Sequence, residues 1–162
     1  MTIQIGQTLP DVEIAVIDGD AEVQRQHIAA LFAGRKAVLF AVPGAFTPTC
    51  SNKHLPGYVA HFGDFRARGI EVFCLAVNDA FVMKAWATAQ QVPEGLKMLA
   101  DGNASFTRAL GLELDGSAYG MGLRARRFAL YVEDGVVRQL HVEALGEFRV
   151  SSAEAMLEAV DD

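Results

Sequence analysis

Cysteine is scarce in this sequence, whose 162 residues include only Cys50 and Cys74. Two cysteines are too few for the disulfide framework of a small secreted domain. The sequence also lacks a C-x-x-C motif and a zinc-type grouping of cysteine and histidine, so we expect no metal site. Any cysteine chemistry in this chain would therefore belong to a free thiol.

Long apolar runs and clusters of basic residues are missing as well. No segment approaches the ~20 consecutive apolar residues of a membrane-spanning helix, and the first residues lack the pattern of a signal peptide. The 14 Lys and Arg are scattered and the formal net charge is −6, which argues against a nucleic-acid-binding surface. We therefore expect a cytoplasmic protein that binds neither membranes nor nucleic acids.

Apolar residues, by contrast, make up 51% of the chain, and charged residues make up 21%. These proportions are close to those of ordinary globular domains. A chain of this length can bury a sizeable core. Because no linker, internal repeat or low-complexity tract interrupts the sequence, we expect a single domain over residues 1–162.

Alternating strand and helix patterns predict an α/β fold with a mixed sheet flanked by helices. The continuous apolar runs at 37–42 and 70–77 are typical of central strands covered on both faces. Other strands are expected at 97–100, 128–132 and 136–142, the last two joined by an Asp-Gly turn. Short extended pieces over 3–17 add an N-terminal β extension. Helices are expected at residues 27–32, 50–68, 80–91, 105–110 and from about 152 to 160.

The segment 42–58, V-P-G-A-F-T-P-T-C-S-N-K-H-L-P-G-Y, concentrates the features that suggest chemistry. It follows the first apolar strand and begins a helix near Thr49, with Thr47 and Thr49 as candidate caps. Cys50 is therefore expected at a helix N-terminus on the carboxyl edge of the sheet, where α/β folds place ligand sites. Free N–H groups and the helix dipole at that position favour a thiolate over a thiol.

Neighbouring residues would shape a small polar pocket around this cysteine. Thr47 lies three residues before Cys50, so its hydroxyl is expected to donate to the sulfur or to an oxygen bound beside it. Pro43 and Pro48 restrict the backbone and remove competing N–H donors. Pro56 lies inside the expected helix and should break or kink it.

Several runs of the sequence, including the one around Cys50, resemble a known family. The runs P-G-A-F-T-P-T-C-S, H-L-P-G-Y, V-N-D-A-F-V-M-K-A-W, R-R-F-A-L-Y-V-E-D-G and G-E-F-R-V-S-S-A-E resemble the peroxiredoxins of the peroxiredoxin-5 or type II branch. The resemblance extends over residues 12–157 and implies a thioredoxin-like fold, homodimers and reduction of hydroperoxides, with no cofactor. It implies that Cys50 is the peroxidatic cysteine, Thr47 its hydroxyl partner, Pro43 the shield of the pocket and Arg127 the active-site arginine.

Two other arginines compete with Arg127 for that position. Arg124 and Arg126 lie just before it in the sequence. Alternation along a strand places Arg126 and Arg127 on opposite faces, so only one of the two can readily point at the cysteine. We expect that residue to be Arg127.

The expected cycle oxidises Cys50 to a sulfenic acid, which a second thiol must reduce. Some relatives carry that thiol near the C-terminus, but the corresponding region here holds Ser151 and Ser152. Cys74 lies in the middle of an apolar strand, where a cysteine usually packs as a small hydrophobic residue; a resolving thiol is the alternative. We therefore expect a one-cysteine cycle with an external reductant. This reductant is expected to be either thioredoxin or glutathione together with glutaredoxin.

Several further residues allow two readings. His54 lies four residues after Cys50 and either orients Arg127 and tunes the thiolate or makes an ordinary polar contact. Phe46 is expected to be exposed, as pocket wall or dimer contact. Asn78 and Asp79 are expected to cap a helix. The side chains of Phe81, Met83 and Trp86 in that helix are expected to lie in the core or in an interface.

Two other functions are compatible with a cysteine at a helix N-terminus. A cysteine hydrolase would need a histidine base, but the histidines other than His54 have no recognisable context. A redox-inert binding module with a thioredoxin fold is the second alternative. Consumption of peroxide distinguishes the peroxidase from both.

Overall fold

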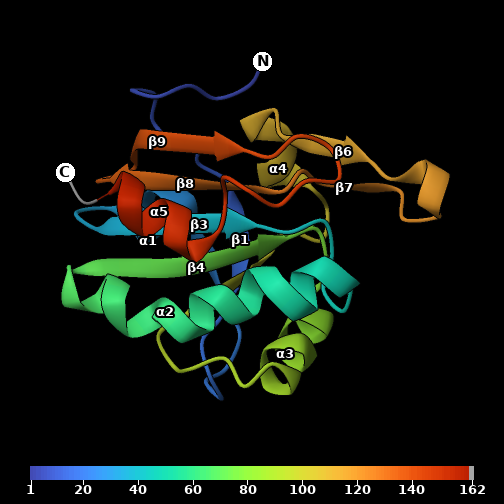
Figure 1. Ribbon diagram of the computed structural model, residues 1–162, viewed down its shortest axis with the longest axis horizontal. Coiled ribbons are helices and arrows are strands. Elements are labelled where there is room, and N and C mark those ends of the chain that lie inside the picture. The colour runs from blue at the N-terminus through green and yellow to red at the C-terminus, as the bar shows by residue number, and fades with distance from the viewer. Residues whose placement is uncertain (161–162) are drawn as a thin grey trace.

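The computed structural model describes residues 1–160, and its centre is a seven-stranded mixed sheet (Figure 1). The strand order is β2-β1-β5-β4-β3-β8-β9. These strands are β1 (Glu13–Ile17), β2 (Gln24–His27), β3 (Lys36–Ala41), β4 (Ile70–Ala76), β5 (Lys97–Ala100), β8 (Phe128–Glu133) and β9 (Val136–Val142). A separate two-stranded sheet pairs β6 (Glu113–Asp115) with β7 (Leu123–Ala125).

Helices cover both faces of the large sheet. Residues of α2, α3 and α5 pack on one face, and residues of α1 and α4 pack on the other. The helices are α1 (Ile28–Phe32), α2 (Leu55–Ala67), α3 (Ala80–Ala89), α4 (Ser105–Leu110) and α5 (Ala153–Ala159), with a π-helical turn η1 (Cys50–His54) and a 3₁₀ turn η2 (Ser117–Tyr119). Within residues 1–160, no helix has the length and apolar character needed to cross a membrane.

Strand β3 lies in the interior of the sheet, parallel to β4 and antiparallel to β8. Its residues alternate between the two layers, with Val38 and Phe40 facing α2 and Leu39 and Ala41 facing α1 and α4. A strand covered on both faces has no polar face, which explains its continuous apolar sequence. The predicted central strand is confirmed, and its carboxyl end leads directly into the segment that contains Cys50.

The predicted N-terminal β extension is also confirmed, because β1 pairs antiparallel with β5. The sequence did not predict β2, since its residues Q-R-Q-H carry no apolar alternation. It also missed the small β6–β7 sheet within the glycine-rich region. That region closes tightly at Gly116, where an added Cβ would lie 2.9 Å from the Gly122 carbonyl oxygen.

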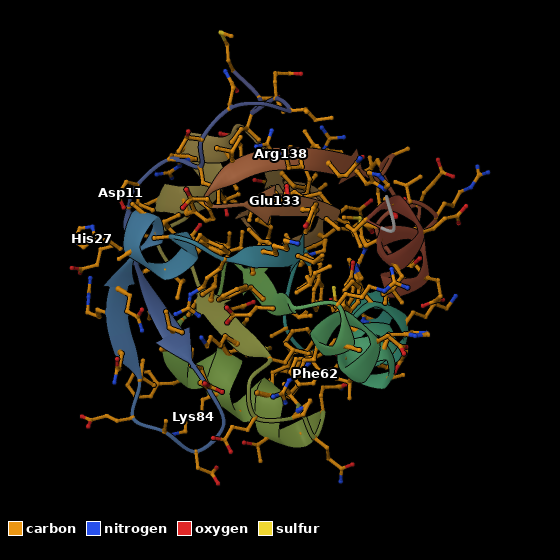
Figure 2. The ribbon with its side chains drawn as sticks, turned by 90° about the vertical axis from the view of Figure 1, so that its left-hand side faces the viewer. Asp11, His27, Phe62, Lys84, Glu133 and Arg138 are labelled. Carbon is orange, nitrogen blue, oxygen red and sulfur yellow. The ribbon has the colours of Figure 1, made fainter. Side chains whose placement is uncertain are left out.

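Charged side chains occupy both edges of the sheet (Figure 2). At the β8–β9 edge, Arg138 Nε lies 3.7 Å from Glu133 Oε1. Beside β2, His27 Nδ1 lies 3.7 Å from Asp11 Oδ1. Charges at exposed edges discourage pairing with strands of other molecules.

The predictions for α3 and its cap are confirmed in part. Met83 and Trp86 are buried as expected, whereas Phe81 is 87% exposed, which excludes the core and leaves an interface as a prediction. Asp79 caps the helix by accepting the N–H of Val82 at 2.8 Å. Asn78 does not cap α3, because its side-chain oxygen accepts the N–H of Ala45 instead.

Burial in the layer under α1 should account for much of the stability. Ile28 is fully buried, whereas Ile5 is 59% exposed. We expect Ile28→Ala to lower the free energy of unfolding by about 2–5 kcal/mol, because the truncation removes apolar burial and leaves a cavity. Ile5→Ala is the matched control and should change it by about 0.5 kcal/mol or less. Urea unfolding followed by circular dichroism measures both, and equal effects would contradict the assignment of the core.

Candidate active site

The loop after β3 is closed by hydrogen bonds of its own. The Thr47 hydroxyl donates to the Gly44 carbonyl at 2.7 Å, and Asn78 holds the Ala45 N–H at 2.9 Å. An added Cβ on Gly44 would lie 3.2 Å from the Thr47 methyl carbon, so the tight closure favours glycine there. The expected donation from Thr47 to the sulfur is therefore absent here, because its only hydroxyl proton is used within the loop.

The helix that carries Cys50 begins at Pro48, close to the predicted start near Thr49, and becomes a wider π-helical turn at Cys50. Pro48 and Thr49 are already helical, and no side chain caps the turn at Thr49. The Leu55 N–H then reaches back to the Cys50 carbonyl, which makes residues 50–54 a π-helical turn. Pro56 neither breaks nor ends the helix: it lies in the first turn of α2. It lacks an N–H and crowds the preceding turn, and the wider π turn relieves this conflict.

Arg127 lies directly against the sulfur of Cys50. Its Nη2 atom is 3.1 Å from Cys50 Sγ, and Cys50 is fully buried. Arg127 immediately precedes β8, and the pairing of Phe128 with Ala41 brings this point of the chain to the carboxyl end of β3. The contact therefore sets a permanent positive charge beside the thiol.

His54 holds the other side of the Arg127 guanidinium. Its Nδ1 atom accepts from Arg127 Nη1 at 2.8 Å, and its Nε2 atom is 3.0 Å from the Ser151 carbonyl oxygen. Desolvation by burial, followed by the Arg127 charge, lowers the pKa of His54 from 6.5 to about 3. The ring is therefore neutral and carries its proton on Nε2, since a carbonyl can only accept. Of the two readings of His54, the contact with Arg127 is the one observed.

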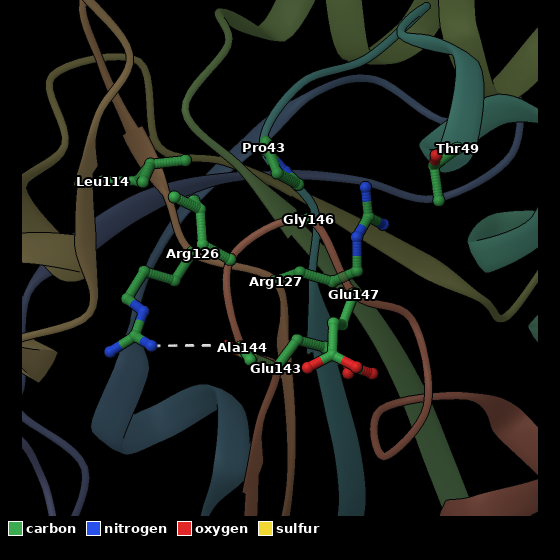
Figure 3. Close-up of a pocket in the computed structure, with 10 residues that line it drawn as sticks. Pro43, Thr49, Leu114, Arg126, Arg127, Glu143, Ala144, Gly146 and Glu147 are labelled. Carbon is green, nitrogen blue, oxygen red and sulfur yellow. Dashed lines mark hydrogen bonds between the residues drawn. The ribbon is translucent and has the colours of Figure 1, made fainter.

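The other two arginines point elsewhere. Arg124 donates to the Met121 carbonyl at 2.9 Å and to the Val77 carbonyl at 3.3 Å. Arg126 donates to the Glu143 carbonyl at 3.3 Å, and Figure 3 shows its guanidinium directed away from that of Arg127. Of the three arginines, Arg127 is therefore the one that contacts Cys50, as the resemblance implied.

A hollow of about 120 Å³ opens beside this cluster (Figure 3). Pro43, Thr49 and Arg127 line one part of it, and residues 143–147 line another, together with Leu114 and Arg126. Its size suits a small molecule, and its lining combines apolar residues with two arginines, Arg126 and Arg127, and two glutamates, Glu143 and Glu147. Pro43 therefore lines the same hollow as Arg127, whose guanidinium contacts Cys50.

Cys74 lies in the interior of β4 and is fully buried. It belongs to the same apolar layer as Cys50 and is paired across the sheet with Phe40. Burial, and then the proximity of Cys50, raises the pKa of Cys74 well above its ordinary value. Cys74 is thus a protonated thiol, and both cysteines are free. Over residues 1–160, no group of three or more His, Cys, Asp or Glu is arranged to hold a metal ion.

The sequence did not single out several residues that complete the site. The Ser151 carbonyl accepts from the Tyr58 hydroxyl at 2.7 Å as well as from His54. The Phe148 ring lies 5.0 Å from the His54 ring, measured between centroids, and 6.0 Å from the Arg127 guanidinium carbon. Glu143 is a buried carboxylate at the end of β9. An acidic residue after a strand carries no local signal that distinguishes it from a surface residue.

Comparison with known proteins identifies this arrangement. Residues 4–157 match the Redoxin family model. The chain is 50% identical over 164 residues to "Peroxiredoxin-2E-2, chloroplastic" of Oryza sativa subsp. japonica, covering 98% of this chain and 73% of that protein. The chain belongs to the peroxiredoxin family. Another peroxiredoxin of the same plant, peroxiredoxin-2C, is 45% identical over 98% of each chain.

A solved peroxiredoxin structure shows the same fold. Reduced Prx3 of Vibrio vulnificus in complex with H₂O₂ has a TM-score of 0.91 and 50% sequence identity, over 99% of this chain and 97% of that one. The thioredoxin-like fold and the thiol peroxidase activity predicted from the sequence are confirmed. The hydrolase and the redox-inert binding module are set aside.

The buried neutral state of His54 should make stability depend on pH. Its pKa in the folded state is about 3, below the value of 6.5 expected after unfolding. Below pH 6.5 the unfolded chain therefore binds a proton that the folded chain does not, so folding loses stability as the pH falls towards 3. From pH 7 to pH 5 the wild type should lose about 2 kcal/mol more unfolding free energy than His54→Gln, which stays neutral.

Urea unfolding at the two pH values measures this difference. Because the comparison is made between pH values within each variant, any loss of packing in His54→Gln cancels. The same pH dependence in both variants would contradict a buried neutral His54.

Proposed function

We propose that this peroxiredoxin reduces hydrogen peroxide and organic hydroperoxides at Cys50 in a one-cysteine cycle completed by an external thiol. The observation that carries this proposal is the 3.1 Å contact between Arg127 Nη2 and Cys50 Sγ. Beside it lies a hollow of about 120 Å³ that suits a small peroxide. The peroxidase activity belongs to the family, and the assignment of steps to residues is proposed here.

In the first step the Cys50 thiolate attacks the distal oxygen of the hydroperoxide. A sulfur–oxygen bond forms, the O–O bond breaks, and the sulfur is oxidised to a sulfenic acid. The remaining oxygen leaves with the electron pair of the broken bond and takes up a proton, giving water from H₂O₂ or an alcohol from an organic hydroperoxide. Arg127 stabilises the negative charge that moves from sulfur to the leaving oxygen.

Ionisation of the thiol explains only a small part of such catalysis. A free thiol of ordinary pKa, ~8.5, is already about 3% thiolate at pH 7, so full ionisation raises reactivity by about thirtyfold at most. That corresponds to about 2 kcal/mol of the barrier. The larger contribution must come from aligning the O–O bond with the sulfur and stabilising charge as it breaks, which is the role of Arg127.

Thr47 and Pro43 act on the peroxide rather than on the sulfur. The Thr47 hydroxyl donates to Gly44, which leaves its lone pairs free to accept from the O–H of a hydroperoxide. Its rotation is fixed by the same bond, so this acceptor is preorganised. Pro43 lines the hollow and offers no N–H that would hold a competing water.

An external thiol completes the cycle. It attacks the Cys50 sulfenic acid, forming a mixed disulfide and releasing water, and a second thiol then releases Cys50 as the free thiol together with a disulfide. Cys74 suits this role poorly, because it is protonated and enclosed in the interior of β4. Thiolate, rather than thiol, is the attacking species.

The identity of the reductant, the assembly and the compartment stay predictions. Glutathione with glutaredoxin, or thioredoxin, is the expected reductant. A homodimer is supported by Phe46, which is 56% exposed in the loop after β3. Large exposed aromatic residues are enriched where proteins associate. The cytoplasmic location rests on the sequence alone.

Substitutions at the two contacting residues test the proposed first step. Cys50→Ser should abolish peroxide consumption, because the nucleophile is lost. Arg127→Ala should lower the rate constant for peroxide reduction by about 10²–10³, the usual cost of removing one preorganised donor. Stopped-flow kinetics with H₂O₂ measures both. Retained turnover in Cys50→Ser, or a wild-type rate in Arg127→Ala, would contradict the assignment.

The one-cysteine cycle predicts that Cys74 is dispensable. Cys74→Ala should keep full turnover with an external thiol, since the substitution leaves a small apolar side chain in the core. After one equivalent of peroxide, a sulfenic-acid trap and mass spectrometry should find the modification on Cys50 in both the wild type and the variant. A disulfide between Cys50 and Cys74 in the wild type would instead establish a two-cysteine cycle.

A further inference from the structure

Glu143 follows β9 directly, is only 4% exposed, and has no role in the steps described above. Its Oε2 atom accepts from three successive backbone N–H groups, those of Arg149, Val150 and Ser151, each at 2.8 Å. The Ser151 hydroxyl adds a fourth bond at 2.7 Å. Three consecutive N–H groups around one oxygen form an anion-binding nest. The carboxylate therefore fixes the backbone of residues 149–151.

These bonds decide the charge of Glu143. Burial by itself would raise the pKa of the carboxyl group, but the hydrogen bonds from Ser151, Arg149 and Val150 outweigh it and lower the pKa below its ordinary value. An ionised acceptor holds N–H donors more strongly than a neutral one. The segment is thus tied to β9 by a charge-assisted set of bonds.

The segment held by Glu143 ends in the Ser151 carbonyl, which faces the active site. Ser151 is fully buried, and its oxygen lies 3.0 Å from His54 Nε2. Since a carbonyl oxygen only accepts, His54 must carry its proton on Nε2 and present Nδ1 as an acceptor. That acceptor holds Arg127 Nη1 at 2.8 Å, while Arg127 Nη2 lies 3.1 Å from Cys50 Sγ. A continuous series of hydrogen bonds therefore joins Glu143 to the sulfur.

We propose that Glu143 is a positioning residue for peroxide reduction: its carboxylate fixes the Ser151 carbonyl, which sets the His54 tautomer and thereby aims Arg127 at Cys50. This inference rests on the role proposed above for Arg127. Glu143 lines the hollow, but its connection to the sulfur passes through Ser151, His54 and Arg127.

The tautomer is what makes this arrangement sensitive to Glu143. If the Ser151 carbonyl moved away, His54 would be free to carry its proton on Nδ1 instead. An N–H would then face the N–H groups of Arg127, and two donors cannot bond each other. The guanidinium would turn away from the sulfur. Misplacement of a catalytic group by about 1 Å can cost a hundredfold in rate.

Three substitutions at Glu143 separate position from charge. Glu143→Ala, which removes the acceptor, should lower the rate constant for sulfenic acid formation at Cys50 by about tenfold to a hundredfold. Glu143→Gln should keep most of the rate, because an amide oxygen in the place of Oε2 retains the four bonds to that oxygen and only the second contact of the Arg149 N–H, with Oε1 at 2.9 Å, is lost. Glu143→Asp keeps the charge but draws it back by one methylene group, so it should be slow. If Glu143→Ala fails to fold, comparing the rate constants of Glu143→Asp and Glu143→Gln gives the same test.

Two readouts distinguish positioning from general stability. In an Arg127→Ala background, Glu143→Ala should cause no further loss of rate, because its effect passes through the guanidinium. The ¹⁵N chemical shifts of the His54 ring should show the Nε2–H tautomer in the wild type and lose that preference in Glu143→Ala. Glu133→Ala, which removes a partly exposed carboxylate from the same hairpin, is the matched control and should keep the wild-type rate and tautomer.

The possible outcomes are distinct. A folded Glu143→Ala or Glu143→Asp that forms sulfenic acid at the wild-type rate would overturn the inference, as would a full additional loss in the Arg127→Ala background. A wild-type rate in Arg127→Ala alone would overturn the proposed function itself. If sulfenic acid forms slowly in Arg127→Ala but at the wild-type rate in Glu143→Ala, only the role of Glu143 is overturned.

Discussion

The hydrogen bond from Arg127 to a neutral His54 is the constraint on which the site depends. An arginine side chain has many rotamers, so a guanidinium must be held if it is to stay beside the sulfur of Cys50. A carboxylate would hold it but would also cancel its charge. A neutral imidazole accepts the same N–H and leaves the positive charge to act on the sulfur. The depressed pKa of His54 is therefore part of how the site works.

The sheet supplies the environment that keeps His54 neutral. His54 lies in the layer between the sheet and α2, with the ring of Phe40 5.0 Å away between centroids. Phe40 comes from β3, the strand that also leads to Cys50, and Arg127 immediately precedes the neighbouring strand β8. Burial of the ring and convergence of the two reacting residues thus follow from the same strand pairing. Peroxiredoxin chemistry here depends on an apolar core that extends up to the sulfur.

Prolines shape the site because each of them lacks a backbone N–H donor. Pro56 removes a backbone donor and crowds the turn before it, and the chain responds with the π turn that bears both Cys50 and His54. Such turns are frequent at functional sites. Pro43 removes a donor at the wall of the hollow. The constraints visible in the sequence at 42–58 therefore act on the shape of the backbone, while the charge comes from a distant residue.

The sequence by itself determined the central strands, the β8–β9 hairpin and the α/β class. These follow from apolar periodicity and turn chemistry, which act over a few residues. The choice of Arg127 over Arg126 came from the family resemblance, since strand alternation alone allows either residue. Only the tertiary structure decided that His54 is buried and neutral, that Thr47 donates to Gly44, that Asn78 holds the loop and that Phe81 is exposed. It also decided the partners of Glu143. The bonds of His54 join residues 73 and 97 positions apart, and no local pattern encodes which distant groups a folded chain brings into contact.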